Sequence, residues 1–544
     1  MSTTRLTANG AAGSRPLPTW TARSPAPARA ARLRAALFTL ALALAAAPVP
    51  AAAQAIDTLA LRAHTRFLAS DLLEGRGTGT RGERLAAAYI AAQLTEQGVR
   101  PLTADGYLLP LPLAAARILP ETELTVAWPG PGPRGVPAGQ VGTLTFRSGQ
   151  EFVVNTGGAA AFHDFGGPLL WLGSPDDAVQ ASLRAPELSG KVVVVSGPLG
   201  AAAGELVPHW IEAGVAGVVS LIPDDDTFQL YVRSRGPERF YVAAPVHDPI
   251  WQPDLPVLLA GPTVSGVITA ALGIGQALAA GRPAPVPTER PDARLDARIR
   301  TTVRAVPSAN VAGFIPGSDP ALRGEAVLFT AHYDHLGIAT PVDGDSIYNG
   351  FSDNAAGVAM VLAIAAALAA DPPARTTAFV FLSGEERGLL GATYLAEGGL
   401  PGGLTPVAVV NLDAGAPPAA PLEWRIAGAD ASTLGDLAVR VTEGAGWDAV
   451  PGAASPNSDY WPFLARGVPA VFLIPGARWE GTSEAEKRAL QARWDRYHQA
   501  GDHWHPDFPF SGLQRYAELG LRVGRAAADA AQAPSMREGP PPRR

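Results

Sequence analysis

Three hydrophobic runs in the second half of the chain, 325–331, 376–382 and 406–412, are predicted to be strands, and each is followed by side chains that can bind metal ions. These side chains are His332, Glu385, Glu386 and Asp413. An aspartate in a loop, Asp353, and a histidine near the C-terminus, His498, complete the set. Imidazole nitrogens and carboxylate oxygens are donors that zinc and related divalent ions accept. The set therefore favours a hydrolase that depends on a pair of divalent metal ions.

Each of these residues also has a structural explanation when it is taken alone. Asp353 could cap the helix that follows it, and Glu385 and Glu386 could interact with the positive end of the next helix. Asp413 could lie in a turn, and His498 on the surface. Their joint occurrence near the ends of predicted strands favours a metal site, because ligands of open α/β sheets bind beyond the carboxyl ends of the strands.

Two neighbouring residues could serve such a site without binding metal. If Glu386 is a ligand, the adjacent Glu385 points elsewhere and is free to take a proton from the attacking water. Asp334 follows His332 by two residues, so its carboxylate can accept the ring N–H of that histidine and fix its tautomer.

Composition limits the kinds of protein and of metal site. The chain has 544 residues, enough for two or three domains, and 47% of them are hydrophobic, as in globular proteins. There are no cysteines, which excludes disulfides and thiolate-bound zinc. The formal net charge of −7 becomes more negative without the first 55 residues, which contain arginines and no acid. We therefore expect no nucleic-acid partner.

The N-terminus is typical of a secretory signal peptide, which we place at residues 1–55. Arg29, Arg32 and Arg34 precede the apolar stretch 35–47, and an Ala-x-Ala sequence follows as a cleavage site. The apolar stretch is short and rich in alanine for a membrane span; an uncleaved anchor is the alternative. We therefore expect an exported protein (periplasmic, secreted or in the cell envelope) without a stable membrane span.

The rest of the chain changes character twice. Residues 56–120 and 295–530 carry helical patterns and hydrophobic runs, which is typical of an α/β domain. Residues 121–290 have short β-like runs and frequent turns, so we expect a β-rich module inserted into the main domain. The last residues, 531–544, are rich in proline and charge and are predicted to be a disordered tail.

A glycine-rich turn lies between two predicted helices near the start of the main domain. Its pattern Gly77-x-Gly79-x-x-Gly82 matches a dinucleotide-binding fingerprint, but a helix precedes it where a strand is required. We therefore expect a loop that packs near the catalytic cleft.

Taken together, the motifs resemble those of the M28 family of zinc aminopeptidases. The segments that carry the resemblance are 331–337 (Ala-His-Tyr-Asp-His-Leu-Gly), 352–357 (Ser-Asp-Asn-Ala-Ala-Gly), 383–386 (Ser-Gly-Glu-Glu), 411–413 (Asn-Leu-Asp), 496–498 (Arg-Tyr-His) and, at the N-terminal end, 67–76. The insert resembles a protease-associated (PA) domain at 190–195 and 213–219. The resemblance covers essentially all of 56–525 and implies an α/β fold, a phosphorylase/hydrolase-like mixed sheet flanked by helices.

The resemblance also implies two zinc ions per chain, with Asp353 shared between them. His332 and Asp413 would complete one site, and Glu386 and His498 would complete the other. These five residues supply three negative charges, which leaves room for a bound hydroxide.

The remaining roles follow from the same resemblance. Glu385 would be the general base that activates water for hydrolysis of a peptide bond, and Asp334 would be the partner of His332. His335 is expected behind the ligands or in the cleft wall, and His503 and His505 at the surface or the cleft rim. The loop 457–460 is expected to line the substrate pocket.

We expect an aminopeptidase that hydrolyses N-terminal residues of peptides. A carboxypeptidase on the same scaffold is the nearest alternative and would need a cationic pocket, for which Arg466, Arg478 and Arg493 are candidates. Acyl transfer like that of glutaminyl cyclases and a binding protein on an inactive peptidase scaffold are further alternatives. A serine hydrolase is disfavoured, because no Gly-x-Ser-x-Gly sequence occurs.

Overall fold

The computed structural model describes residues 56–129, 141–156, 162–182, 187–235, 238–244 and 254–537. The expected signal peptide lies outside these ranges, as do residues 538–544 of the expected tail. Within the described part of the tail, the carbonyl of Ser535 accepts a hydrogen bond from Thr433, and Arg537 forms an ion pair with Asp436.

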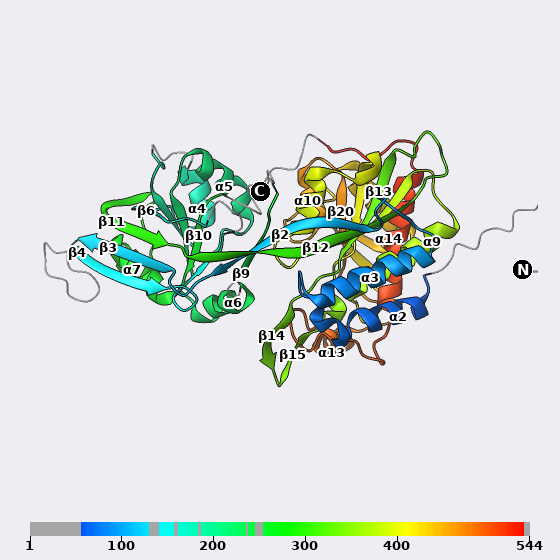
Figure 1. The fold of residues 1–544 in the computed structure, drawn as a ribbon, viewed down its shortest axis with the longest axis horizontal. Coiled ribbons are helices and arrows are strands. Elements are labelled where there is room, and N and C mark those ends of the chain that lie inside the picture. The colour runs from blue at the N-terminus through cyan, green and yellow to red at the C-terminus, as the bar shows by residue number, and fades with distance from the viewer. Residues whose placement is uncertain are drawn as a thin grey trace, which may run out of the picture. The chain divides into compact units, whose positions relative to one another are not determined.

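The larger of two main sheets (Figure 1) contains the strand that ends on His332 and the strands that precede Glu386 and Asp413. Its strands run in the order β19 (Asp448–Gly452), β18 (Glu423–Ala427), β20 (Ala470–Pro475), β17 (Thr405–Asn411), β13 (Glu325–His332), β16 (Thr376–Leu382), β12 (Thr301–Ile315), β2 (Leu108–Ile118) and β9 (Glu238–Val242), and β1 (Arg100–Pro101) pairs with β12. The central strands β20, β17, β13 and β16 are parallel. The predicted α/β fold with a mixed sheet is therefore confirmed.

The central strands are unbroken hydrophobic runs because both of their faces are buried. Along β13, Val327 and Phe329 face one core, whereas Ala326 and Leu328 face the other. Helices that cover the first face are α2 (Thr58–Leu68), α3 (Arg81–Glu96), α9 (Ala356–Ala370), α11 (Thr433–Gly444) and α14 (Ser511–Asp529). Helices that cover the second face are α10 (Leu390–Gly398) and α12 (Tyr460–Ala465).

The helix that follows the Asp353 loop is apolar on nearly every side. The helical stretch Phe351–Ala370, which comprises η4 (Phe351–Ala355) and α9, is long and apolar enough to cross a membrane by length and composition. However, 78% of the apolar 18-residue window within it is buried inside the protein. Its apolar side chains are therefore explained by contacts with α2, α14 and β13.

The second sheet is built from residues 123–298. Its strands run in the order β4 (Val141–Arg147), β3 (Glu123–Pro129), β11 (Thr288–Arg298), β6 (Phe165–Trp171), β7 (Val192–Ser196), β8 (Gly217–Leu221), β10 (Val257–Ala260) and β5 (Phe152–Val154). The helices α4 (Pro175–Ser182), α5 (Ala203–Glu212), α6 (Asp225–Arg235), α7 (Pro262–Ala271) and α8 (Gly275–Ala279) lie between or after these strands in the chain. They accompany the parallel strands β6, β7, β8 and β10, since parallel neighbours need long crossover connections.

The remaining elements are short or lie outside the two main sheets. They are the hairpin β14 (Gly337–Val342) and β15 (Asp345–Tyr348), the helical turns η1 (Asp71–Arg76), η3 (Gly200–Ala202) and η5 (Pro401–Gly403), and the helix α13 (Glu484–Trp494).

Strand register brings the site residues to one edge of the larger sheet. His332 at the end of β13 pairs with Leu382 at the end of β16, so the Ser383–Glu386 loop begins level with His332. Thr330 pairs with Asn411 at the end of β17, which places Asp413 level with His332 as well. The fold therefore delivers these loops to a common point beyond the carboxyl ends of the strands.

Close packing between α14 and β13 gives a first prediction. A Cβ on Gly524 would lie 2.1 Å from the ring of Phe329. We predict that Gly524→Ala lowers the free energy of unfolding by about 1–3 kcal/mol, the usual cost of overpacking, although alanine favours helix. Gly520→Ala on the same helix is the control, because its nearest neighbours are the flexible ends of Leu412 and Ile364, at 3.1–3.3 Å. Denaturant unfolding of both variants measures the difference; equal stabilities would contradict the prediction.

Candidate active site

The structure brings all of the predicted metal-binding residues together. His332 is the last residue of β13, Glu386 and Asp413 follow β16 and β17, and Asp353 lies in η4. His498 arrives from the segment between α13 and α14, with a positive φ of 55°. Residues separated by more than 160 positions in the sequence thus converge on one small volume.

Asp353 lies between the two histidines and faces each with a different oxygen. His332 Nε2 is 3.1 Å from Asp353 Oδ1 and 2.9 Å from Asp413 Oδ1. On the other side, His498 Nε2 is 3.0 Å from Asp353 Oδ2 and 3.2 Å from Glu386 Oε2. The carboxylate of Asp353 is therefore placed to be shared by two adjoining sites.

These separations fit the coordination of a divalent metal. In tetrahedral zinc sites with bonds of about 2.0–2.2 Å, neighbouring ligand atoms lie roughly 3.3 Å apart. The histidine–carboxylate distances given above run from 2.9 to 3.2 Å. Ligand-type atoms also cluster within 4.8 Å of one another in two groups, which are His332, Glu385, Asp413 and His335, Asp353, Glu386. The donor set and its spacing therefore fit two divalent ions.

The site combines several buried acids with two histidines, and their pKa values are strongly shifted. Burial raises the pKa of Glu385 and of Asp459 well above their usual range, and repulsion from Asp413 adds to both shifts. Burial of His332 lowers its pKa, but the negative charges of Asp413 and Glu385 outweigh this effect and raise the pKa well above its usual range. Hydrogen bonds from His332 and His498 outweigh burial and lower the pKa of Asp353 well below its usual range. The acids Asp353, Glu385, Asp413 and Asp459 thus outnumber the two histidines that interact with them.

Asp334 meets His332 in a different way from the one we expected. The ring Nδ1 of His332 lies 3.1 Å from the main-chain carbonyl oxygen of Asp334 and 3.8 Å from its carboxylate. The prediction that the carboxylate accepts the ring N–H is therefore wrong, because the short loop places the carbonyl in that position. The carboxylate instead accepts hydrogen bonds from Thr78 Oγ1 (2.7 Å) and from the N–H of Glu385 (3.2 Å). Asp334 thus connects the loops of β13 and β16.

His335 belongs to the second group of ligand-type atoms. It is fully buried, and its Nδ1 lies 2.7 Å from Glu386 Oε1. It is 3.8 Å from the carboxylate of Asp353. His335 therefore orients Glu386, on the side of the site away from His332.

The loop that precedes α12 contributes partners for Asp413. Ser458 Oγ donates a hydrogen bond to Asp413 and accepts one from the side chain of Asn411 (2.7 Å). Asp459 is 1% exposed, and neither of its carboxylate oxygens has a hydrogen-bond partner among the described residues. Tyr460 is buried and bonds back to Ser455, so it does not offer its hydroxyl to the site.

Sequence reasoning missed Asp502, which fixes the loop of Asp353. Its carboxylate accepts hydrogen bonds from the N–H groups of Ser352 (3.0 Å) and Asp353 (3.1 Å), and its carbonyl accepts one from Phe351 (3.0 Å). Burial raises the pKa of Asp502 to about 6. Its position four residues after His498, within the segment 498–505, could have indicated it, but only the three histidines of that segment were predicted to lie at or near the site.

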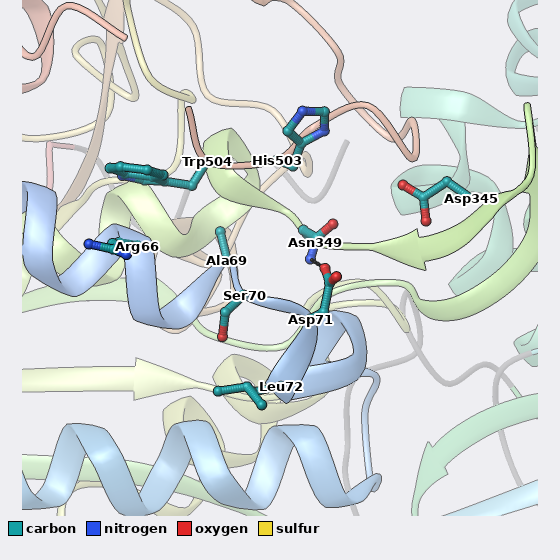
Figure 2. A pocket seen from close by; sticks show the side chains of 9 residues that line it. All are labelled: Arg66, Ala69, Ser70, Asp71, Leu72, Asp345, Asn349, His503 and Trp504. Carbon is teal, nitrogen blue, oxygen red and sulfur yellow. Dashed lines mark hydrogen bonds between the residues drawn. The ribbon is translucent and has the colours of Figure 1, made fainter. Parts of the chain in front are cut away.

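The other two histidines of that cluster lie elsewhere. His505 accepts a hydrogen bond from the N–H of Asp507 at 3.1 Å and is partly exposed. His503 lines a pocket of about 590 Å³, shown in Figure 2, together with Arg66, Asp71 and Trp504. None of the predicted metal ligands lines this pocket.

The glycine-rich segment near the N-terminus reaches the site, as the prediction of a loop near the cleft required. Glu83 is 1% exposed and accepts hydrogen bonds from Ser383, Ser308 (2.8 Å) and the N–H of Gly79 (2.6 Å). Ser383 begins the loop that carries Glu385. Glu83, near the start of α3, therefore supports the loop that carries Glu385.

Comparison with known proteins adds an independent finding. Residues 310–522 match the profile of peptidase family M28. Among solved structures, an aminopeptidase from Aneurinibacillus sp. strain AM-1 shares 16% identity, with 88% of this chain and 95% of that chain covered and a TM-score of 0.51. A zinc aminopeptidase from Bacillus subtilis shares 17% identity (86% and 94% covered, TM-score 0.41). A peptidase M28 precursor from Shewanella amazonensis SB2B shares 16% (89% and 98%, TM-score 0.44). No curated protein matches the sequence.

The burial of Glu83 predicts a dependence of stability on pH. Burial raises its pKa from 4.5 to about 7, against the hydrogen bonds from Ser383, Ser308 and Gly79. The folded protein then binds this proton more tightly than the unfolded chain, so the stabilisation is complete below about pH 4.5 and is lost as pH rises through 7.

We therefore predict that Glu83→Gln, which cannot ionise, gains stability relative to the wild type as pH rises from 5 to 8.5, by up to about 3 kcal/mol. The glutamine oxygen can still accept from Gly79 while its NH₂ group donates to the two serines. Glu96→Gln, at an exposed position on the same helix, is the control. A difference between Glu83→Gln and wild type that is independent of pH would contradict the prediction.

Proposed function

We propose that the protein is a metallopeptidase of family M28, whose profile residues 310–522 match, and in particular a two-zinc aminopeptidase that removes N-terminal residues from peptides. The observation that carries the proposal is the pair of adjoining His/carboxylate groups that share Asp353. One zinc ion would be held by His332, Asp353 and Asp413, and the other by Asp353, Glu386 and His498. Zinc bound there would lower the pKa of a coordinated water and polarise the scissile carbonyl.

Glu385 is the residue placed to move protons. It lies in the same cluster as His332 and Asp413, and its carboxylate makes no hydrogen bond to another described residue. Its N–H is held by Asp334, which fixes the direction of the loop. Glu385 would accept the proton of the attacking water and deliver it to the nitrogen of the leaving amine.

The charge of the site favours an amine over a carboxylate at the substrate terminus. Asp459 and Glu385 are acids without hydrogen-bond partners among the described residues, beside the acids that would bind zinc. The ammonium group of a peptide N-terminus would supply the opposite charge. An aminopeptidase therefore fits these surroundings better than a carboxypeptidase.

The arginines considered for a carboxylate pocket are engaged elsewhere. Arg466 forms an ion pair with Glu397, and Arg478 forms one with Asp448. Arg493 lies 3.9 Å from Asp507 and stacks over Trp494. These contacts remove the specific support that the sequence offered for carboxypeptidase activity.

Metal content and terminal specificity test the proposal together. We expect the purified protein to bind about two zinc ions per chain and to release p-nitroaniline from aminoacyl-p-nitroanilides, with loss of cleavage on chelation and recovery with zinc. N-acetylated versions of the same substrates are the control and should resist cleavage. Cleavage of N-blocked peptides from their carboxyl end would instead support the carboxypeptidase alternative, and binding of no zinc would overturn the proposal.

The adjacent glutamates should separate into two phenotypes. We predict that Glu385→Gln lowers kcat by about 10²–10⁴-fold, as expected for loss of a general base, while the zinc content stays that of the wild type. Glu386→Gln, its matched partner, should lose zinc as well as activity, because it removes a proposed ligand. Metal analysis beside steady-state kinetics distinguishes them. Loss of zinc from Glu385→Gln would contradict the assigned roles.

A further inference from the structure

Arg76 is fully buried beneath the metal-binding loops, at the end of η1. Its guanidinium donates to main-chain carbonyl groups: Nε to Tyr333 (2.8 Å), one terminal nitrogen to Asn349 (2.6 Å) and the other to Gly350 (2.9 Å). A further hydrogen bond goes to the carbonyl of Leu68. No carboxylate of a described residue lies within ion-pair distance of it.

The carbonyl groups that Arg76 holds belong to two of the ligand-carrying loops. Tyr333 follows His332 directly, and Asn349 and Gly350 lead into the turn that carries Asp353. One rigid, planar group therefore spans both loops and sets the distance between them. These are the loops whose side chains meet at 3.1 Å, from His332 Nε2 to Asp353 Oδ1.

The backbone around Arg76 packs closely against the two ligand-carrying loops. Arg76 has a φ of 50°, and its own carbonyl accepts a hydrogen bond from the N–H of His335 (3.1 Å). A Cβ on the preceding Gly75 would lie 2.4 Å from the carbonyl oxygen of Tyr348. Thr78, two residues later, bonds to Asp334. The segment thus contacts the His332 loop at several points.

Arg76 also remains charged at neutral pH. Burial lowers its pKa to about 10, and attraction by Asp353, Asp502 and Asp334 limits the decrease. A positive charge therefore lies behind the acids of the site.

We propose that Arg76 is a positioning residue of the metal centre, which holds the His332 and Asp353 loops in ligand geometry before metal binds. The inference rests on the proposed zinc sites. It assigns to Arg76 the preorganisation of the centre, which lowers the cost of bringing the ligands together when zinc arrives. Arg76 does not contact the substrate in this role.

Arg375 provides a matched comparison within the same domain. It is 1% exposed, its Nε is 2.6 Å from Glu325, and it donates to the carbonyl of Ala528. It lies immediately before β16, at the end of the strand opposite the metal-binding loops. Loss of a buried arginine there should disturb the fold without touching the centre.

The test measures zinc affinity of the whole chain by competition with a chromophoric chelator. We expect Arg76→Lys to weaken zinc binding by about 10-fold or more, as loss of an outer partner of a metal site does, and Arg76→Met to weaken it further. At saturating zinc, the kcat of Arg76→Lys should return toward that of the wild type with an unchanged KM. Arg375→Lys should lower the Tm and leave zinc affinity as in the wild type.

Each outcome decides the inference. Wild-type zinc affinity in a folded Arg76→Lys variant, checked by circular dichroism, overturns it while leaving the proposed function intact. Equal weakening by Arg375→Lys also overturns it, because general loss of stability would then explain the effect. If Arg76→Met does not fold, the zinc affinity of Arg76→Lys alone tests the inference. Lysine keeps the positive charge and loses only the planar set of N–H donors of the guanidinium. Absence of zinc from the wild type overturns the proposed function and this inference together.

Discussion

Buried carboxylates repel one another, and each loses hydration free energy when it leaves water. The site nevertheless gathers Asp334, Asp353, Asp459 and Asp502 at exposures of 7% or less. Such a cluster is stable only if positive charge and hydrogen-bond donors surround it. The histidines, the buried Arg76, the N–H groups that bond to Asp502 and the hydroxyl of Thr78 can each be understood as part of this compensation. Divalent ions would supply the charge that remains missing, which explains why so acidic a centre can be built at all.

The arrangement of strands makes this concentration of charge possible. Parallel neighbours bring their carboxyl ends to one edge, so each strand delivers its next few residues to the same volume. The pairing of His332 with Leu382 and of Thr330 with Asn411 fixes, to within a residue, where the loops that follow β16 and β17 begin relative to His332. A shift of one residue in either pairing would turn the ligand to the other face of the sheet. The hydrophobic cores on both faces, which fix the register, thereby also fix the geometry of the centre.

The sequence predicted the central strands well, because burial on both faces of the sheet makes each of them an unbroken apolar run. The runs 325–331, 376–382 and 406–412 correspond to β13, β16 and β17 within a residue or so, because an unbroken apolar run fits a central strand. The convergence of residues after these strands followed from the same topology. Arg76, Asp502 and the carbonyl of Asp334 could not be found in this way. Each of these contacts has a main-chain group on one side, which every residue carries, so no residue type in the sequence marks the contact.

Two adjacent glutamates in one loop illustrate how surroundings assign different chemistry to the same side chain. Burial and the nearby Asp353 disfavour the charge of Glu386, yet His335 and His498 lower its pKa to about 2, which suits a ligand that must stay ionised. For Glu385, burial outweighs the attraction of His332 and raises the pKa well above the usual range, which suits a group that receives a proton. Pairs of titratable groups whose environments separate their pKa values commonly divide acid–base roles in this way. The division here depends on His335, whose Nδ1 lies 2.7 Å from Glu386 Oε1, whereas Glu385 belongs to the other group of ligand-type atoms, with His332 and Asp413.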